Sequence, residues 1–591
     1  MIMNGIARRR TALAMMCAVA SLGAVIPVAA ADDDITAAST APAGAQRTAA
    51  KPGWITNKSP MAGLQADTWA ELVGPTQDPW RAKGKVIART GFKPERDGFH
   101  FFNYSNVGSS LPNLLNKYIY GGNYSTVKNL GPQQMINLFG RRSVCVGKKK
   151  GKPTSCVLSL GAKKWMDSIN RVSSGGHCFG MAMNAAEIFN GQLSQTQLGG
   201  RSTTHAIPFK PAATRSIAQA FSLQTLATSP NLQPRQAVKL LKRGLRPGQA
   251  PFTLSMEASG GGGHAVTPIA LSKTGKGTYD ISIYDNNYPG RVRAIHANTN
   301  YVPGTKRQVG FDYELFSLPG RPPEKLVGQI NLWDISKLQR KFACPFCGGA
   351  NKTTVHLQPV MTQTPIKVSL RSPSGAKVKG LRRIRPSNPW LPGGPQPLPS
   401  FQVPRGKAFK LVINNGANAQ PVDTMVTATT GELTWALEYY QVAAGSVDSI
   451  AITPKSGRLD FSTTQGSSPA VAMVDHSTRF NPREIVTGPD EMAPGSSFTT
   501  KTNTRRGTFS FTPGNGASAG GAIQLVQQRN DGGAVQVATS GEPLPLNVPV
   551  GSHLAWNYLK WKVSAPRVKL DVVGPNGAAV GQWIPLQTAT E

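Results

Sequence analysis

Acidic residues are scarce in this 591-residue chain, which has 30 Asp and Glu against 65 Lys and Arg. The formal net charge at pH 7 is therefore +35, and a protein this basic is drawn to anionic surfaces. The sequence also lacks any recognised nucleic-acid-binding module. We therefore expect anionic cell-surface polymers, and not a specific nucleic acid, as charged partners. The basic runs at residues 148–152 and 377–385 would contribute most, although each run is also compatible with an ordinary solvated surface.

Long apolar runs are absent after the first 30 residues, so nothing there is predicted to span a membrane. Before that point, Arg8, Arg9 and Arg10 precede an apolar stretch that ends in three alanines. This pattern predicts a secretory signal peptide over residues 1–31, cut before Asp32. Removing the three arginines lowers the net charge from +35 to +32. We expect a secreted or cell-surface-associated protein without a transmembrane anchor.

Cysteines are also few, with six in the chain and five after residue 31. Cys145 and Cys156 bracket a loop rich in Gly, Lys and Pro, which predicts a local disulfide. Cys344 and Cys347 form a C-P-F-C sequence, for which a structural disulfide is favoured over a redox dithiol or half of a zinc site. Secreted proteins tend to pair their cysteines, and the one left over, Cys178, is a candidate reactive thiol.

Cys178 follows a glycine loop and begins a predicted amphipathic helix. The apolar stripe of this helix consists of Met181, Ala185, Ile188 and Phe189. A cysteine at a helix N-terminus faces unpaired backbone N–H groups and the positive end of the helix dipole, and both favour the nucleophilic thiolate. A lone cysteine is also commonly a small buried hydrophobic residue. Whether Cys178 is catalytic therefore depends on which side chains lie beside it.

A predicted β-hairpin supplies two such partners. Apolar, β-branched runs lie on both sides of a Gly/Lys turn, and a turn centred between Thr274 and Gly275 puts His264 opposite Asp285. Directly opposed side chains share a face, with Cβ atoms about 4.5–5.5 Å apart. A carboxylate at this position suits the task of holding an imidazole in one tautomer. Asn286 points to the other face in this register, so Asp285 is the preferred partner, unless a bulge shifts the pairing by one residue.

The order of these three segments resembles the papain-like cysteine peptidase superfamily. The resemblance rests on GGHCFGMA around Cys178, GGGHAV around His264 and YDNNYPG around Asp285, within residues 86–345. It implies that Cys178 is the nucleophile, His264 the general base and acid, and Asp285 the residue that orients His264. It also implies an α+β papain-like catalytic fold that requires no metal or cofactor.

The resemblance leaves the oxyanion-binding residue open. Papain-like enzymes use a Gln six residues before the nucleophile, whereas this chain has Val172 there. Asn170 is the nearest side-chain amide and the candidate substitute, although a capping or turn role suits it equally.

The rest of the chain differs in character. Residues 32–85 are rich in Ala, Thr, Pro and Lys and are predicted to form a flexible linker or propeptide. After the catalytic domain, segments of alternating apolar and polar residues predict two all-β, sandwich-like domains at 355–470 and 471–591.

The sequence therefore predicts a secreted cysteine peptidase or peptide amidase that acts on a peptide or protein through a thioester. Transglutaminase-like acyl transfer, which uses the same three residue types, is the nearest alternative. A non-catalytic, basic surface-binding protein with a vestigial triad is the alternative from a different class.

Overall fold

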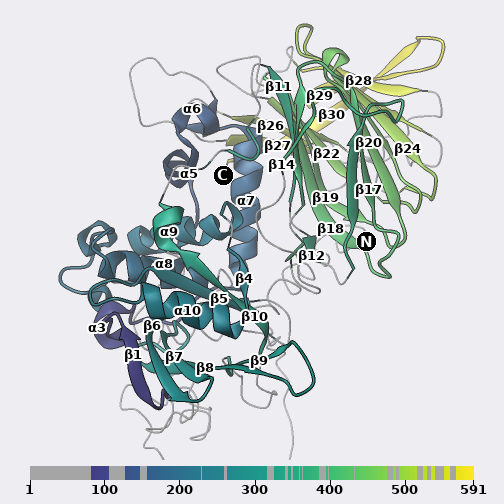
Figure 1. The fold of residues 1–591 in the computed structure, drawn as a ribbon. Helices are drawn as coiled ribbons and strands as arrows, with labels where there is room; N and C mark the ends of the chain where they lie inside the picture. The colour runs from purple at the N-terminus through teal and green to yellow at the C-terminus, as the bar shows by residue number, and fades with distance from the viewer. Residues whose placement is uncertain are drawn as a thin grey trace, which may run out of the picture. The chain divides into compact units, whose positions relative to one another are not determined.

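The fold is described from a computed structural model (Figure 1). It describes residues 81–105, 127–146, 156–227, 229–258, 263–315 and 325–339, and most of 342–590 apart from short gaps. The predicted signal peptide and most of the predicted linker lie outside these residues. Backbone contacts divide the chain into two compact units. The α/β unit contains Asn170–Arg340 and the described residues before 130, and the β unit contains Leu130–Ile169 and Lys341–Glu591.

One antiparallel sheet organises the α/β unit. Its strand order is β4-β10-β5-β6-β7-β8-β9, and β1 also pairs with β6. The strands are β1 (Lys85–Arg89), β4 (Asn231–Leu232), β5 (Phe252–Ala258), β6 (Gly263–Gly275), β7 (Thr278–Tyr284), β8 (Val292–Tyr301), β9 (Gln308–Asp312) and β10 (Leu326–Asp334). The α-helices are α3 (Pro94–Asp97), α8 (Cys178–Phe189), α9 (Pro211–Ser222), α10 (Pro234–Gly244) and α11 (Ile335–Leu338). Short 3₁₀ turns lie at η2 (Ser173–Gly175), η3 (Gln195–Leu198), η4 (Thr204–Ala206) and η5 (Leu223–Thr225).

Helix α8 is buried on almost every side and packs against both α9 and the sheet. Gly180, two residues after Cys178, makes the contact with α9 possible. A Cβ atom at this glycine would lie 2.0 Å from the backbone oxygen of Ile217. The glycine of the C-F-G sequence therefore serves the close approach of the two helices.

The β6–β7 hairpin differs from the predicted register. Thr267 pairs with Tyr284, and continuing this pairing puts Asp285 diagonal to His264 instead of directly opposite. Two irregularities, between Pro268 and Ala270 and between Lys273 and Gly275, each shift the register by one residue. A shift of one residue moves a side chain to the other face of the sheet, and a second shift moves it back. His264 and Asp285 therefore still lie on the same face of the sheet.

One predicted strand is absent from this unit. The sequence of residues 97–104 predicts a strand, but in the structure Asp97 ends α3, which begins at Pro94, and irregular chain follows. Proline at the first helical position has the dihedral angle that a helix start requires. The segment after α3 carries aromatic side chains into a core shared with α8 and α9.

The β unit begins with three helices and a two-stranded ribbon: α5 (Pro132–Phe139), α6 (Arg141–Val144), α7 (Leu160–Val172, with its last three residues in the α/β unit), β2 (Cys145–Val146) and β3 (Val157–Leu158). Disulfides join Cys145 to Cys156 and Cys344 to Cys347, as the sequence predicted. The aromatic rings of Phe139, Trp165 and Phe346 pack together beside the second disulfide.

Two antiparallel sheets form the rest of the β unit. One has the order β14-β16-β11-β18-β19-β22-β23-β26-β27-β30, and the other β13-β17-β20-β21-β24-β25-β28-β29-β30. The strands are β11 (Lys352–Leu357), β13 (Lys367–Arg371), β14 (Arg382–Ile384), β16 (Ser400–Pro404), β17 (Phe409–Asn414), β18 (Val422–Thr429), β19 (Leu433–Val442), β20 (Val447–Thr453), β21 (Arg458–Ser462), β22 (Ala470–Asp475), β23 (Arg483–Thr487), β24 (Ser497–Asn503), β25 (Thr508–Pro513), β26 (Gln524–Gln528), β27 (Ala534–Thr539), β28 (His553–Asn557), β29 (Arg567–Val573) and β30 (Ala579–Thr590). A separate short pair is formed by β12 (Val360–Met361) and β15 (Pro395–Gln396).

From β18 onward, successive hairpins alternate between the two sheets. Hairpins β18–β19, β22–β23 and β26–β27 lie in the first sheet, and β20–β21, β24–β25 and β28–β29 in the second. The sequence predicts a domain boundary at 470/471, but β19 pairs with β22 and β21 with β24 across that position. The strand pairing therefore continues through the expected boundary.

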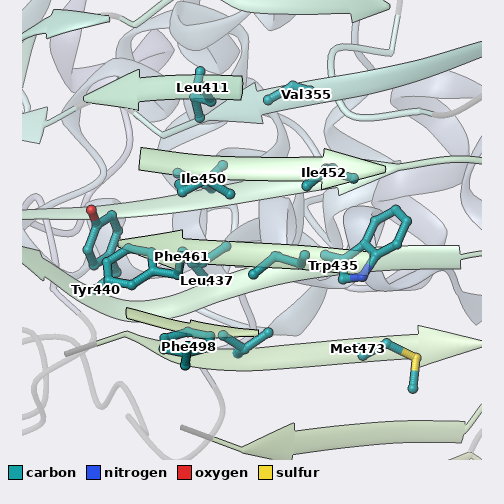
Figure 2. Close-up of a cluster of buried hydrophobic side chains, with 14 of the residues drawn as sticks. Val355, Leu411, Trp435, Leu437, Tyr440, Ile450, Ile452, Phe461, Met473 and Phe498 are labelled. Atoms are coloured by element: carbon teal, nitrogen blue, oxygen red, sulfur yellow. The ribbon is translucent and has the colours of Figure 1, made fainter. Parts of the chain in front are cut away.

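The two sheets share one apolar core (Figure 2). Trp435 and Met473 of the first sheet lie in it with Ile450, Phe461 and Phe498 of the second. Alternate residues of β20 and β25 are buried, as expected for strands with one face in a core. This arrangement explains the period-two pattern that the sequence analysis used to predict sandwich-like structure.

Among the described residues, no helix combines the length and apolar character needed to cross a bilayer.

Candidate active site

Cys178 is the first residue of α8, as the sequence predicted, and its side chain is buried. It is the one free cysteine among the residues that the structure describes, because the other four form the two disulfides. The backbone carbonyl of Cys178 accepts a hydrogen bond from Nδ2 of Asn286 (3.1 Å), which also donates to the carbonyl of Ala265 (2.9 Å). Asn286 thus ties the start of α8 to the strand that carries His264.

His264 lies at the start of β6, where it pairs with Met256 of β5. Its ring is buried, and Nε2 donates to Oδ1 of Asp285 over 2.7 Å. The side chain of Cys178 also lies close enough to raise the pKa of the ring. Because Nε2 is occupied by Asp285, Nδ1 is the atom that remains for Cys178. The structure therefore brings together all three residues that the sequence analysis selected.

The electrostatic balance at His264 favours its charged form. Burial lowers the pKa of His264, but the charge of Asp285, its hydrogen bond and the contact with Cys178 raise it to about 10. Burial is the largest single influence, but the interactions with Asp285 and Cys178 together outweigh it. His264 is consequently protonated at neutral pH.

Asp285 follows β7 directly and is fully buried. Its Oδ1 also accepts from the backbone N–H of Asn287 (2.8 Å), and its Oδ2 accepts from the hydroxyl of Tyr313 (2.5 Å). Burial on its own raises the pKa of Asp285. The charge and hydrogen bond of His264, followed by Arg293 and Tyr313, outweigh burial and lower that pKa below its usual value. Asp285 is therefore an ionised carboxylate whose orientation is fixed from three directions.

Two residues that support Asp285 were not predicted from the sequence. Tyr313 lies just after β9, and Arg293 of β8 donates to its hydroxyl over 3.0 Å. Arg293 is buried, and its guanidinium lies 4.0 Å from the centre of the Tyr288 ring. An arginine within the apolar run of β8 was the available signal, because a buried guanidinium requires a partner.

His177, next to the nucleophile, is not a second base. Its ring is fully buried, stacks on Tyr104 at 4.2 Å and donates from Nδ1 to the carbonyl of Tyr104 (2.9 Å). Burial lowers the pKa of His177 to about 4, so the ring is neutral at neutral pH. Asn170 is the candidate for oxyanion binding that the sequence offers. This residue lies near the end of α7, where its carbonyl accepts from the hydroxyl of Ser173 (3.0 Å).

The described residues contain no group of three or more His, Cys, Asp or Glu side chains placed to hold a metal ion. Comparisons with protein-family models, curated proteins and solved structures find no match to this chain.

Proposed function

We propose that the protein is a thiol hydrolase of the papain-like type, a cysteine peptidase or peptide amidase. The observation that carries this proposal is the position of His264, which is hydrogen-bonded to Asp285 and also interacts with the side chain of Cys178. The chain order of the three residues, and a cysteine that begins a helix packed on the antiparallel sheet carrying the histidine, support a papain-like catalytic fold.

Each residue has a defined part in the reaction. The Cys178 thiolate, paired with the His264 imidazolium, attacks an amide carbonyl and forms a carbon–sulfur bond. The imidazolium then gives its proton to the leaving amine as the carbon–nitrogen bond breaks, which leaves a thioester. Neutral His264 next takes a proton from water, which attacks the thioester and releases a carboxylic acid and the thiolate. Asp285 keeps the ring in place and stabilises its charged form.

The proposed substrate is a peptide or protein outside the membrane. Two disulfides are typical of an oxidising compartment and support secretion. Lys377, Lys379, Arg382 and Arg383 of the second basic run are exposed, which supports attraction to anionic cell-surface polymers. The first run, at 148–152, lies outside the described residues.

Alkylation of Cys178 and substrate cleavage together test this proposal. The purified protein would be treated with iodoacetamide, digested and analysed by mass spectrometry, in parallel with the Cys178→Ser variant. A mixed peptide library incubated with both proteins would then be searched for new termini. We expect alkylation at Cys178 and cleavage by the unmodified wild type alone. Cleavage that survives in Cys178→Ser, or a thiol that resists iodoacetamide, would contradict the proposal.

The same assay separates hydrolysis from acyl transfer. Added primary amines, such as methylamine, intercept a thioester and appear as amides on the acyl product. If the products carry the amine even when water is in large excess over it, transferase activity replaces hydrolysis as the function. If neither product forms and basic surface binding is unchanged in Cys178→Ser, the protein is a non-catalytic binding protein.

A further inference from the structure

Asn103 occupies the junction between the segments that carry Cys178 and Asp285. Its side-chain oxygen accepts from the backbone N–H of His177 (2.7 Å), one residue before the nucleophile. Its own backbone N–H donates to the carbonyl of Asn286 (2.9 Å), one residue after Asp285. Asn103 is 1 % exposed, so both contacts are made inside the protein.

The other half of this amide has no partner. Nδ2 of Asn103 is buried and makes no hydrogen bond to any residue that the structure describes. The orientation of the amide is fixed by chemistry, because the N–H of His177 only donates and must therefore face the oxygen. A buried donor left without an acceptor costs about 1–3 kcal/mol, so a native structure retains one for a reason.

The location of this donor indicates its use. Both Nδ2 and the oxygen bonded to His177 belong to one planar group, so the N–H bonds of Nδ2 lie at the start of α8. The N–H of Cys178 is among the helix N-terminal N–H groups that have no acceptor within the helix. The two donors therefore lie at the same end of α8, of which Cys178 is the first residue.

We propose that Asn103 Nδ2, together with the backbone N–H of Cys178, binds the oxygen of the carbonyl group that Cys178 attacks. This inference rests on the proposed function and assigns its oxyanion-binding side chain. When the thiolate forms the carbon–sulfur bond, the π electron pair of the carbonyl moves to oxygen, which becomes an anion. Asn103 donates a hydrogen bond to that anion and keeps its proton. The pair returns to carbon as the carbon–nitrogen bond breaks and His264 protonates the amine.

A donor fixed in advance at the point where negative charge develops stabilises the transition state more than the ground state. Asn103 meets that condition, because its oxygen is held by His177 and its backbone by Asn286. The sequence signal for it was weak. Asn103 lies 75 residues before the nucleophile, and no spacing rule links the two positions.

The test uses p-nitrophenyl acetate, whose burst of p-nitrophenol reports acylation of Cys178, with iodoacetamide as a second probe. Displacement of iodide forms no oxyanion, so alkylation reports only the thiolate and its access. Asn103→Asp keeps the acceptor for His177 and removes the donor. We expect acylation to fall about 10²–10³-fold in Asn103→Asp and in Asn103→Ala. Alkylation at Cys178 should change little in both variants. The melting temperature should fall in Asn103→Ala, because this change leaves the buried N–H of His177 without its acceptor.

Two further variants serve as matched controls. Asn129→Ala removes another amide beside His177, whose Nε2 lies 3.0 Å from its side-chain oxygen, and Asn170→Ala removes the amide that the sequence offered as a candidate. Both should acylate at the wild-type rate. Normal acylation in Asn103→Asp, or a loss in Asn170→Ala of the size expected for Asn103, would overturn the assignment while the proposed function stands. Equal losses of acylation and alkylation in both Asn103 variants would also overturn it, because they would show a structural role. A wild type that is neither acylated nor alkylated would overturn the function and this inference together.

Discussion

The hydroxyl of Tyr313 donates a 2.5 Å hydrogen bond to Oδ2 of Asp285, whose other oxygen holds His264. Arg293 donates to the same hydroxyl, so a continuous chain of contacts runs from a buried guanidinium to the nucleophile. Each member keeps the next one charged or oriented. Disturbing the far end of the chain should therefore change the reaction without touching a substrate.

Replacing Tyr313 with Phe tests this chain directly. The change removes one hydrogen bond to a buried carboxylate and should lower the free energy of unfolding by about 1.5–3 kcal/mol. It should also raise the pKa of Asp285, so the acid limb of the alkylation rate at Cys178 should move to higher pH. Urea unfolding and a pH series of iodoacetamide rates measure both effects. Tyr301→Phe is the matched control, because its hydroxyl binds Arg235 at the exposed surface and its loss should change stability by less than about 0.5 kcal/mol.

The high pKa of His264 predicts the alkaline limit of activity. The thiolate–imidazolium pair requires a protonated ring, and the pKa of about 10 keeps the ring protonated well above its ordinary value of 6.5. The rate of hydrolysis should accordingly be sustained through neutral pH and fall only as the pH nears 10. A decline centred between pH 6 and 7 would show that Asp285 and Cys178 do not control this group.

Asp285→Asn separates the charge of Asp285 from its shape. Without the carboxylate, burial becomes the main influence on His264 and lowers its pKa, so the alkaline limb should shift to lower pH. Activity at the optimum should fall by at least about 10-fold and at most about 10⁴-fold. Steady-state kinetics across the pH range measure both changes. An unshifted limb would exclude Asp285 as the partner of His264 in solution.

The same pair links stability to pH. The folded-state pKa of His264 is higher than the unfolded value of 6.5, so its contribution to stability is fully present below pH 6.5. That contribution is lost as the pH rises from 6.5 towards 10. The difference in unfolding free energy between the wild type and His264→Gln should therefore shrink over this range. A difference that grows with pH would have the wrong sign for a raised histidine pKa.

Gly180→Ala tests the packing of the nucleophile helix. The new methyl group would meet the backbone oxygen of Ile217, which cannot rotate away, so α8 must move. We expect a loss of about 1–3 kcal/mol in unfolding free energy and slower alkylation of Cys178. Gly131→Ala is the control, because its Cβ has no neighbour closer than 3.4 Å and Cys178 lies in the other unit. It should leave the alkylation rate unchanged.

The three residues of the candidate site could be selected from the sequence because each lies in a recognisable local pattern. Cys178 follows glycines at a helix start, and His264 and Asp285 flank one hairpin. The exact register was wrong because the turn lies two residues later than predicted, between Gly275 and Thr278, and two irregularities in the pairing then shift it back by one residue each. Their number was even, and the shared face survived.

The residues that support the candidate site could not be predicted from the sequence, for a physical reason. Tyr313 and Arg293 meet Asp285 only once β7, β8 and β9 have assembled, and Asn103 arrives from irregular chain that looked like a strand. Contacts of this kind depend on tertiary structure and have no fixed spacing. In the β unit, alternation predicted strands well but gave no sign of which hairpins would pair.

Because the hairpins of the β unit alternate between the two sheets, each hairpin is hydrogen-bonded to the next but one along the chain. Neighbour-only bonding of this kind resembles that of repeat proteins, whose stability is nearly a sum over units. Gain or loss of one hairpin from each sheet would leave the same kind of strand pairing between the remaining hairpins. The length of this unit can therefore change in whole steps of one hairpin from each sheet without altering the α/β unit that carries Cys178.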